Sequence, residues 1–574
     1  MQQKKQQIQN REELIYALCR AAEIEHGLTC IYLFTAFSMK KFLVEGIDEI
    51  QRDKIRNWQG LIFSVARQEM EHLGLVCNLL NAIGGAQHFS RPNLPQPADY
   101  YSTVNDFALK TFSLETMAEF MNFEKPANST DVHAEVEAGN PIVPTPFIIH
   151  NHHTVQELYE TIREGFAYLD EELPGELFIG PPEAQVDGED IDVGFDNSEF
   201  GITMIKINNL QDAFAAIDEI VEQGEGVILG DPAHLDPRQQ KAKALYLLLD
   251  KNVKALAEQS IEADNWPKAL HKLIRYCGSI NTILRKSKKL FEASSDDIAL
   301  LDSMIERIST AQAKLKALRE RPFSKPNQRK ANAARQDAYN PANYEAEGLL
   351  LAQFIEADCH YLKFWEIYLD IKANHFEAGR HVVNNPMLRL HDDNRYSKDV
   401  FIVSQPYTQS AMALFNAGYE TMVQMLLLFF TYSNMTANER TMLMRTAFFP
   451  LMTMFTRPLG QTLTLLPADK DFAQQKHPFR AGPSFEYYSN IALLAHQPPN
   501  WIYLHERLLE MAELAQTLTT IPKKLTQWLR KEQLLDEVQD QMTYLATNIQ
   551  RMADNFASGM QLTDSTTTAH ASKS

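Results

Sequence analysis

The sequence predicts an all-α protein, for three reasons. Apolar residues recur three and four positions apart through most of the 574-residue chain, which is the period of an amphipathic helix. Alternating strand patterns are scarce, and the clearest, GITMIKIN at 201–208, is short enough to be a linker. The composition, 45% hydrophobic and 22% charged, is that of a soluble globular protein. The predicted helices are 11–45, 53–83, 111–122, 154–170, 210–225, 238–320, 344–372, 406–432, 437–457 and 501–560.

Composition divides these helices into several parts. The loops at 84–110 and 171–210 are long and rich in Pro, Gly, Asn and Asp. Residues 238–340 are rich in Lys, Arg, Ala, Leu, Gln and Glu, which is typical of a helical insertion. The Pro- and Asn-containing stretch at its end, 322–341, is typical of an exposed linker. The expected parts are a helical domain in two segments (1–237 and 341–500), the helical insertion with its linker (238–340), C-terminal helices (501–562) and a disordered tail (563–574).

The charge and hydropathy of the chain exclude several classes of function. Lys and Arg number 55 against 74 Asp and Glu, so the net charge is −19, the wrong sign for a nonspecific nucleic-acid binder or an anionic-membrane binder. The apolar run at 422–430 is short and contains Gln424, which predicts a buried core helix rather than a membrane span. The polar N-terminus lacks an apolar signal-peptide core, so we expect a cytoplasmic protein.

The helix predicted at 53–83 carries an acid and an imidazole within its apolar stripe. Glu69 and His72 are three residues apart and therefore point the same way, into the interior, whereas Glu71 points away. A buried carboxylate needs compensation of its charge, and a metal ion can provide it. The alternative is a buried hydrogen bond between Glu69 and His72, because Glu-x-x-His is common by chance.

The first predicted helix also has an acid within its apolar stripe. This acid is Glu25, and its neighbours in the stripe are Leu, Ala and Tyr residues. Glu23 and His26 form a second Glu-x-x-His, but Glu23 shares a more polar face with Arg20, so Glu25 is the preferred candidate. Two neighbouring antiparallel helices that each bury a carboxylate indicate a site between them. Helical bundles assemble carboxylate-bridged dimetal centres in this way.

The chain resembles the ferritin-like domain of the iminophenyl-pyruvate dimer synthase family, enzymes of violacein- and rebeccamycin-type biosynthesis. The resemblance covers about residues 10–490, interrupted by the insertion. Eight short strings match in the expected order: AAEIEHGLTCIYLFTAFS (21–38), ARQEMEHLGLVCNLLNAIGG (66–85), FEKP (123–126), TVQELYETI (154–162), ELFIGPPEAQV (176–186), IVEQGEG (220–226), HYLKF (360–364) and AGPSFE (481–486).

The resemblance implies a ferritin-like four-helix bundle with a non-haem di-iron site, in which manganese could replace iron. The fourth Glu-x-x-His of such a site is absent, so Glu222 and His360 are assigned in its place from two segments, with Glu225 and Glu356 as substitutes. Glu222 could equally be a solvated acid. The implied metal ligands are Glu25, Glu69, His72, Glu157, Glu222 and His360.

Two functions of different classes follow. The first is a metal-dependent oxidoreductase of secondary metabolism that acts on an amino-acid-derived small molecule. The chain shows no ferredoxin-like cysteine set and no dinucleotide fingerprint, so electrons would come from the substrate or from elsewhere. The second is a non-catalytic ferritin-like interaction or iron-binding protein. Helices 238–320 and 501–560, which have charged faces, could bind a partner or a second copy of the chain.

Overall fold

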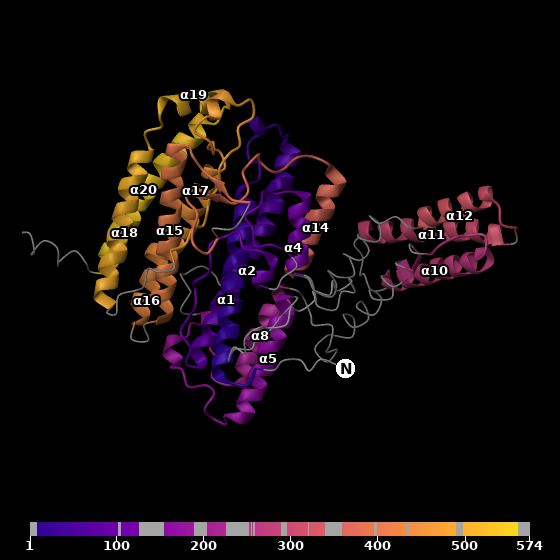
Figure 1. The fold of residues 1–574 in the computed structure, drawn as a ribbon, viewed down its shortest axis with the longest axis horizontal. Helices are drawn as coiled ribbons and strands as arrows, with labels where there is room; N and C mark the ends of the chain where they lie inside the picture. The colour runs from indigo at the N-terminus through magenta and orange to yellow at the C-terminus, as the bar shows by residue number, and fades with distance from the viewer. Residues whose placement is uncertain are drawn as a thin grey trace, which may run out of the picture. The chain divides into compact units, whose positions relative to one another are not determined.

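The computed structural model describes residues 8–101, 105–124, 154–188, 204–224, 249, 252–253, 255–256, 259–288, 295–319, 321–338, 359–394, 399–431, 435–488 and 497–560. The chain divides into two compact units. The first comprises Met1–Glu225 and Phe376–Ser574, and the second is Gly226–His375. Helices make up most of the described residues in both units, which confirms the all-α prediction (Figure 1).

Helix α1 (Arg11–Phe37) and helix α2 (Glu49–Ala82) pack along each other in the first unit (Figure 1). The Asn10 side chain accepts a hydrogen bond from the Glu13 amide, and Asp48 does the same for Gln51, so side chains cap both helices at their N-termini. Helix α5 (Val155–Glu172) packs against α1, and α8 (Leu210–Gly224) packs against α2 and α5. These four helices surround the candidate site.

The remaining elements of the first unit extend this core. Helices α15, α17, α18 and α20 pack against one another. A two-residue parallel pair joins β1 (Pro386–Met387) to β2 (Phe401–Ile402). The other elements are η1 (Leu43–Glu45), α3 (Ala98–Tyr101), α4 (Leu114–Phe123), η2 (Pro182–Ala184), α15 (Pro406–Thr431), α16 (Ala437–Leu443), the π-helices η3 (Met444–Phe448) and η4 (Leu451–Thr456), α17 (Arg457–Leu463), η5 (Phe472–Gln474), α18 (Gln497–Leu518), α19 (Lys523–Lys531) and α20 (Leu535–Gly559).

Helix α15 is the one described helix that is long and apolar enough to cross a membrane. Most of its apolar stretch is buried within the protein, as expected for the core helix predicted around 422–430. Length and composition alone do not distinguish a core helix from a membrane span.

The second unit contains three packed helices, α10 (Trp266–Ser287), α11 (Ser295–Arg319) and α12 (Lys325–Ala338), and also α14 (His360–Asn374). The three packed helices share an apolar core of their own. Helix α12 corrects the linker predicted at 322–341. Its alanines Ala331, Ala334 and Ala338 are buried in that core, and the three- and four-residue spacing of such small side chains gives a weak hydrophobic pattern.

One other predicted helix differs from the structure, and the segment 201–208 follows its linker alternative. Residues 204–208 are irregular, as expected of a linker rather than a strand, and 201–203 lie outside the described residues. The first helix ends at Phe37 rather than at 45. Ser38 is its C-cap, Met39 then forms a backbone bridge with Gly379, and residues 43–45 form the separate turn η1.

Gly418 of α15 is tightly packed against Phe455, so a substitution at this position tests the packing of the first unit. A Cβ atom at this position would lie 2.0 Å from Cε1 of Phe455, so we expect Gly418→Ala to lower the free energy of unfolding by about 1–3 kcal/mol. Urea unfolding would measure this change. Gly60→Ala in α2 is the control, since nothing lies within 4 Å of its Cβ position and alanine favours a helix. Equal effects of the two substitutions would contradict the packing at Gly418.

Candidate metal centre

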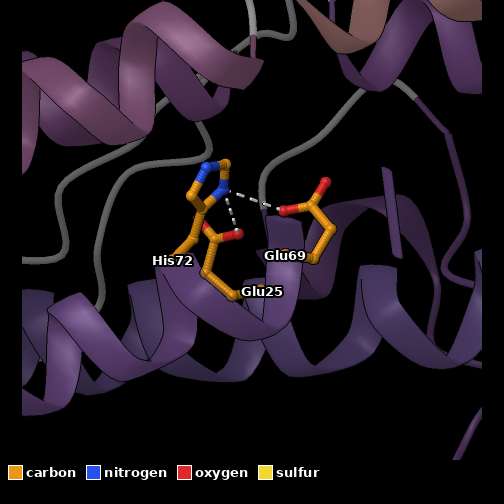
Figure 2. Close-up of side chains that lie close together, drawn as sticks. All are labelled: Glu25, Glu69 and His72. Atoms are coloured by element: carbon orange, nitrogen blue, oxygen red, sulfur yellow. Dashed lines mark hydrogen bonds and ion pairs between the residues drawn. The ribbon is translucent and has the colours of Figure 1, made fainter. Parts of the chain in front are cut away.

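Three buried side chains from α1 and α2 converge in the first unit. Glu25, Glu69 and His72 are only 1–2% exposed, and each offers a ligand atom within 4.8 Å of the others. His72 Nδ1 lies 3.1 Å from Glu69 Oε2 and 3.5 Å from Glu25 Oε2, so this nitrogen faces both carboxylates (Figure 2). The packing of α1 along α2 brings the two acidic stripes into contact.

Neighbouring helices hold these side chains in place. Tyr159 of α5 donates a hydrogen bond of 2.5 Å to Glu25 Oε1. Gln223 of α8 places its Oε1 3.2 Å from Nε2 of His72, on the side of the ring opposite the carboxylates. An amide oxygen there accepts a hydrogen bond from the Nε2–H group, and Nδ1 is left directed at the acids. Such outer contacts fix the ring orientation and tautomer of a metal-binding histidine.

A third acid, Glu124, lines the same small cavity. It follows directly after α4, is buried, and accepts a hydrogen bond from the Tyr32 hydroxyl of α1. The cavity has a volume of about 10 Å³, enough for roughly one water-sized guest or an ion. Its wall is mainly apolar and includes Leu28, Val155, Ile220 and Val221.

Burial and mutual repulsion change the protonation of the cluster. Burial, with the adjacent Glu69 carboxylate as the next cause, raises the pKa of Glu25 to about 7. Burial alone would lower the pKa of His72, but hydrogen bonds and attraction from Glu25 and Glu69 outweigh it and raise that pKa well above its usual value. In the metal-free protein Glu25 therefore titrates near neutral pH, and His72 keeps its proton to a higher pH than a free imidazole does.

The donor set and the cavity fit a transition-metal ion. Carboxylate oxygens suit iron and manganese, and an imidazole nitrogen is a common additional ligand. A cation would also compensate two carboxylates that are both withdrawn from water. The alternative Glu69–His72 hydrogen bond is present as well. Glu25 also approaches the same ring nitrogen of His72. The cluster therefore has two carboxylates and one imidazole, whereas the hydrogen-bond alternative needs only Glu69 and His72.

The structure does not bring Glu157 or Glu222 to this cavity. Helix α5 presents Val155 and Tyr159, four residues apart, to the cavity, whereas Glu157 lies about 200° around the helix and is half-buried in its first turn. Glu222 is exposed, while its neighbour Gln223 contacts His72. Both predicted acids therefore lie on faces of α5 and α8 that do not line the cavity.

The other predicted ligands have separate outcomes. His360 is the buried first residue of α14 in the second unit, and its role as a ligand stays a prediction. The substitutes Glu225 and Glu356 lie outside the described residues. Glu23 pairs with Arg20 at 2.9 Å and with His88 at 3.3 Å, away from the group that contains Glu25.

Sequence reasoning missed Glu124, Tyr159 and Gln223. Glu124 stands in the string FEKP and Tyr159 in TVQELYETI, both of which carry the resemblance, but neither residue was assigned a role. An acid placed directly after an apolar helix, as at Glu124, is the signal that could have indicated a buried position. Nothing in the local sequence distinguishes Gln223 from a surface glutamine.

Comparison with known proteins identifies the domain. Residues 18–246 match a family model described as Ferritin-like, so the helices around the cavity belong to a ferritin-like domain. The chain is 27% identical over 255 residues to dichlorochromopyrrolate synthase of Lentzea aerocolonigenes, a match that covers 40% of this chain and 24% of the synthase. It thus spans about a quarter of that relative's length.

A solved structure gives a weaker likeness. A ferritin-like protein from Caulobacter vibrioides is 17% identical, and the match covers 48% of this chain and 96% of that one. Its TM-score of 0.27 is too low to add to the fold assignment. The ferritin-like part of the predicted resemblance is therefore confirmed for the domain, and the similarity to the synthase is distant.

Proposed function

We propose that this protein is a metal-dependent oxidoreductase whose ferritin-like domain binds non-haem iron, as a pair of ions by analogy with other ferritin-like bundles, and that it acts on an amino-acid-derived small molecule. The convergence of buried Glu25, Glu69 and His72 is the observation that supports this proposal most directly. Glu124 adds a third buried carboxylate to the cavity from another element. Ferritin-like bundles use carboxylates and Glu-x-x-His pairs from several helices in this manner.

The chain's own residues would perform the following tasks. When bound, iron would supply redox chemistry with dioxygen or peroxide as the oxidant. In the metal-free protein the pKa of Glu25 is raised to about 7, so this carboxyl would give up its proton when a cation binds, while the Tyr159 hydroxyl donates to its Oε1. Gln223 keeps Nδ1 of His72 directed at the ligand position. The apolar cavity wall excludes bulk water, which strengthens these electrostatic interactions.

The substrate class rests on the distant synthase relative and on the family resemblance. Only a quarter of that relative is matched, so its activity as a whole does not transfer to this chain. Fold similarity alone also does not determine a reaction. We therefore restrict the proposal to oxidation of an amino-acid-derived compound.

Metal content tests the proposal. Inductively coupled plasma mass spectrometry on protein purified without chelator should find about two iron or manganese ions per chain. Glu69→Ala/His72→Ala should lose most of this metal, since two ligands disappear from the cluster. Substrate trials with dioxygen and with peroxide would then measure activity in the loaded protein.

Glu222→Gln is the matched control, because Glu222 is exposed and does not line the cavity. It should keep the metal content of the natural protein. Absence of bound metal, both as purified and after anaerobic reconstitution with ferrous iron, would refute the oxidoreductase proposal. The buried cluster would then be an internal hydrogen-bonding network, as in the non-catalytic alternative.

A further inference from the structure

The three-helix part of the second unit has the opposite charge to the rest of the protein. Residues 259–338 contain 16 Lys and Arg but only 9 Asp and Glu, a net charge of +7, in a chain whose total is −19. Helices α10, α11 and α12 in this segment share their own apolar core. The positive charge is therefore a property of one folded part.

Part of this charge surrounds a hollow between α10 and the end of α11. The hollow has a volume of about 550 Å³ and is open to solvent, with all of its lining side chains exposed, so it would hold a ligand at the surface rather than enclose it. Five of its six lining residues lie in α10, four of them at spacings of three, four and seven from Lys268 to Arg275, and Arg319 ends α11. The lining residues are Pro267, Lys268, His271, Lys272, Arg275 and Arg319.

The cations of this hollow lack acidic partners among the described residues. Elsewhere in the same helices, Lys288 pairs with Asp302 at 2.5 Å and Lys314 with Asp337 at 2.8 Å. No such ion pair involves the cationic side chains that line the hollow. Their mutual repulsion is unfavourable, and a bound anion would relieve it.

The side chains that line the hollow indicate which class of anion it could bind. Pro267 is the one apolar side chain in the lining, so the hollow offers little to the apolar centre of a protein partner. The strongly negative total charge of the chain opposes the approach of a long polyanion such as nucleic acid. Lysine ammonium groups and arginine guanidinium groups together suit phosphate oxygens.

We propose that this hollow binds a small soluble anion that carries two or more phosphate groups. Lys268, Lys272, Arg275 and Arg319 supply the charge, and His271 adds a ring nitrogen. The site lies within the second unit and uses none of the residues of the metal centre. Its success or failure is thus independent of the proposed oxidoreductase function.

Isothermal titration calorimetry of the full chain with inorganic triphosphate tests this proposal. We expect a saturable isotherm with one site per chain. Lys272→Gln/Arg275→Gln should weaken binding by about tenfold or more, since hydrogen bonds to charged groups are lost. The matched control is Arg329→Gln/Lys330→Gln, which removes the same charge from exposed positions of α12 outside the hollow. The control should change affinity by less than about threefold.

Several outcomes would overturn the proposal. Absence of binding to the natural chain is one, and equal weakening in both double variants is another, because it would indicate a nonspecific charge effect. Tighter binding of a single-stranded oligonucleotide than of triphosphate, with equal sensitivity to both double variants, would indicate a nucleic-acid surface instead. Circular dichroism of each variant verifies that the helices remain folded, as expected for substitutions of exposed side chains.

Discussion

Replacing Glu69 with glutamine is expected to remove most of the bound metal while leaving the protein folded. The substitution keeps the shape of the side chain but deletes one of the two carboxylates that face His72 Nδ1. Metal content should fall by about tenfold or more, because a neutral amide is a much weaker ligand than a carboxylate. The metal-free protein should lose no stability, and could gain about 1 kcal/mol, since one buried charge disappears.

Glu71→Gln provides the matched control for this prediction. Glu71 is also buried in α2, but it lies 3.6 Å from Arg67 and does not line the cavity. Mass spectrometry should find unchanged metal in Glu71→Gln and depleted metal in Glu69→Gln, and urea unfolding should compare their metal-free stabilities. Full metal content in both variants would contradict the assignment of Glu69 as a ligand.

The second large effect is expected at the buried ion pair between Glu45 and Arg380. Their side chains are 4% and 3% exposed, and Arg380 Nε lies 2.6 Å from Glu45 Oε1. Arg480 Nη1 also donates to Glu45 at 3.3 Å. Removing one partner of a buried pair leaves the other charge uncompensated, so Glu45→Gln should lower the free energy of unfolding by about 3 kcal/mol.

The pH dependence of this effect has a defined sign. Burial opposes ionisation of Glu45, but attraction and hydrogen bonds from Arg380 outweigh it and lower the pKa of Glu45 below 4.5. Because the folded-state pKa is below the unfolded-state value, the stabilisation is complete above the unfolded-state value and is lost as pH falls through the folded-state one. Urea unfolding of natural protein and Glu45→Gln should therefore differ most near pH 7 and converge in acid.

Glu377→Gln is the control for the ion pair, because Glu377 pairs with Lys40 at 3.3 Å and its side chain is 82% exposed. Its cost should stay below about 1 kcal/mol at every pH, as is usual for surface pairs. A cost for Glu45→Gln that is equally small, or that does not change between pH 7 and pH 3, would show that the buried pair does not stabilise the fold.

The sequence predicted the features that depend on local periodicity. The helix around Glu69 and His72 extends over Glu49–Ala82, and α15 covers the predicted segment 406–432 to within one residue. Local signals were insufficient for α12. The residues that it buries against α10 and α11 are alanines, and their weak hydrophobic pattern is also compatible with a linker. The resemblance, rather than a local signal, assigned Glu157, and α5 presents Val155 and Tyr159 to the cavity in its place.

By itself, the sequence determined the all-α class and placed Glu25, Glu69 and His72 in apolar helix stripes. This was possible because a spacing of three or four residues fixes which side chains share one face of a helix. Only the tertiary structure decided that Tyr159, Gln223 and Glu124 surround the cluster. Those contacts join elements far apart in the chain, and their geometry depends on how each helix is rotated when it packs.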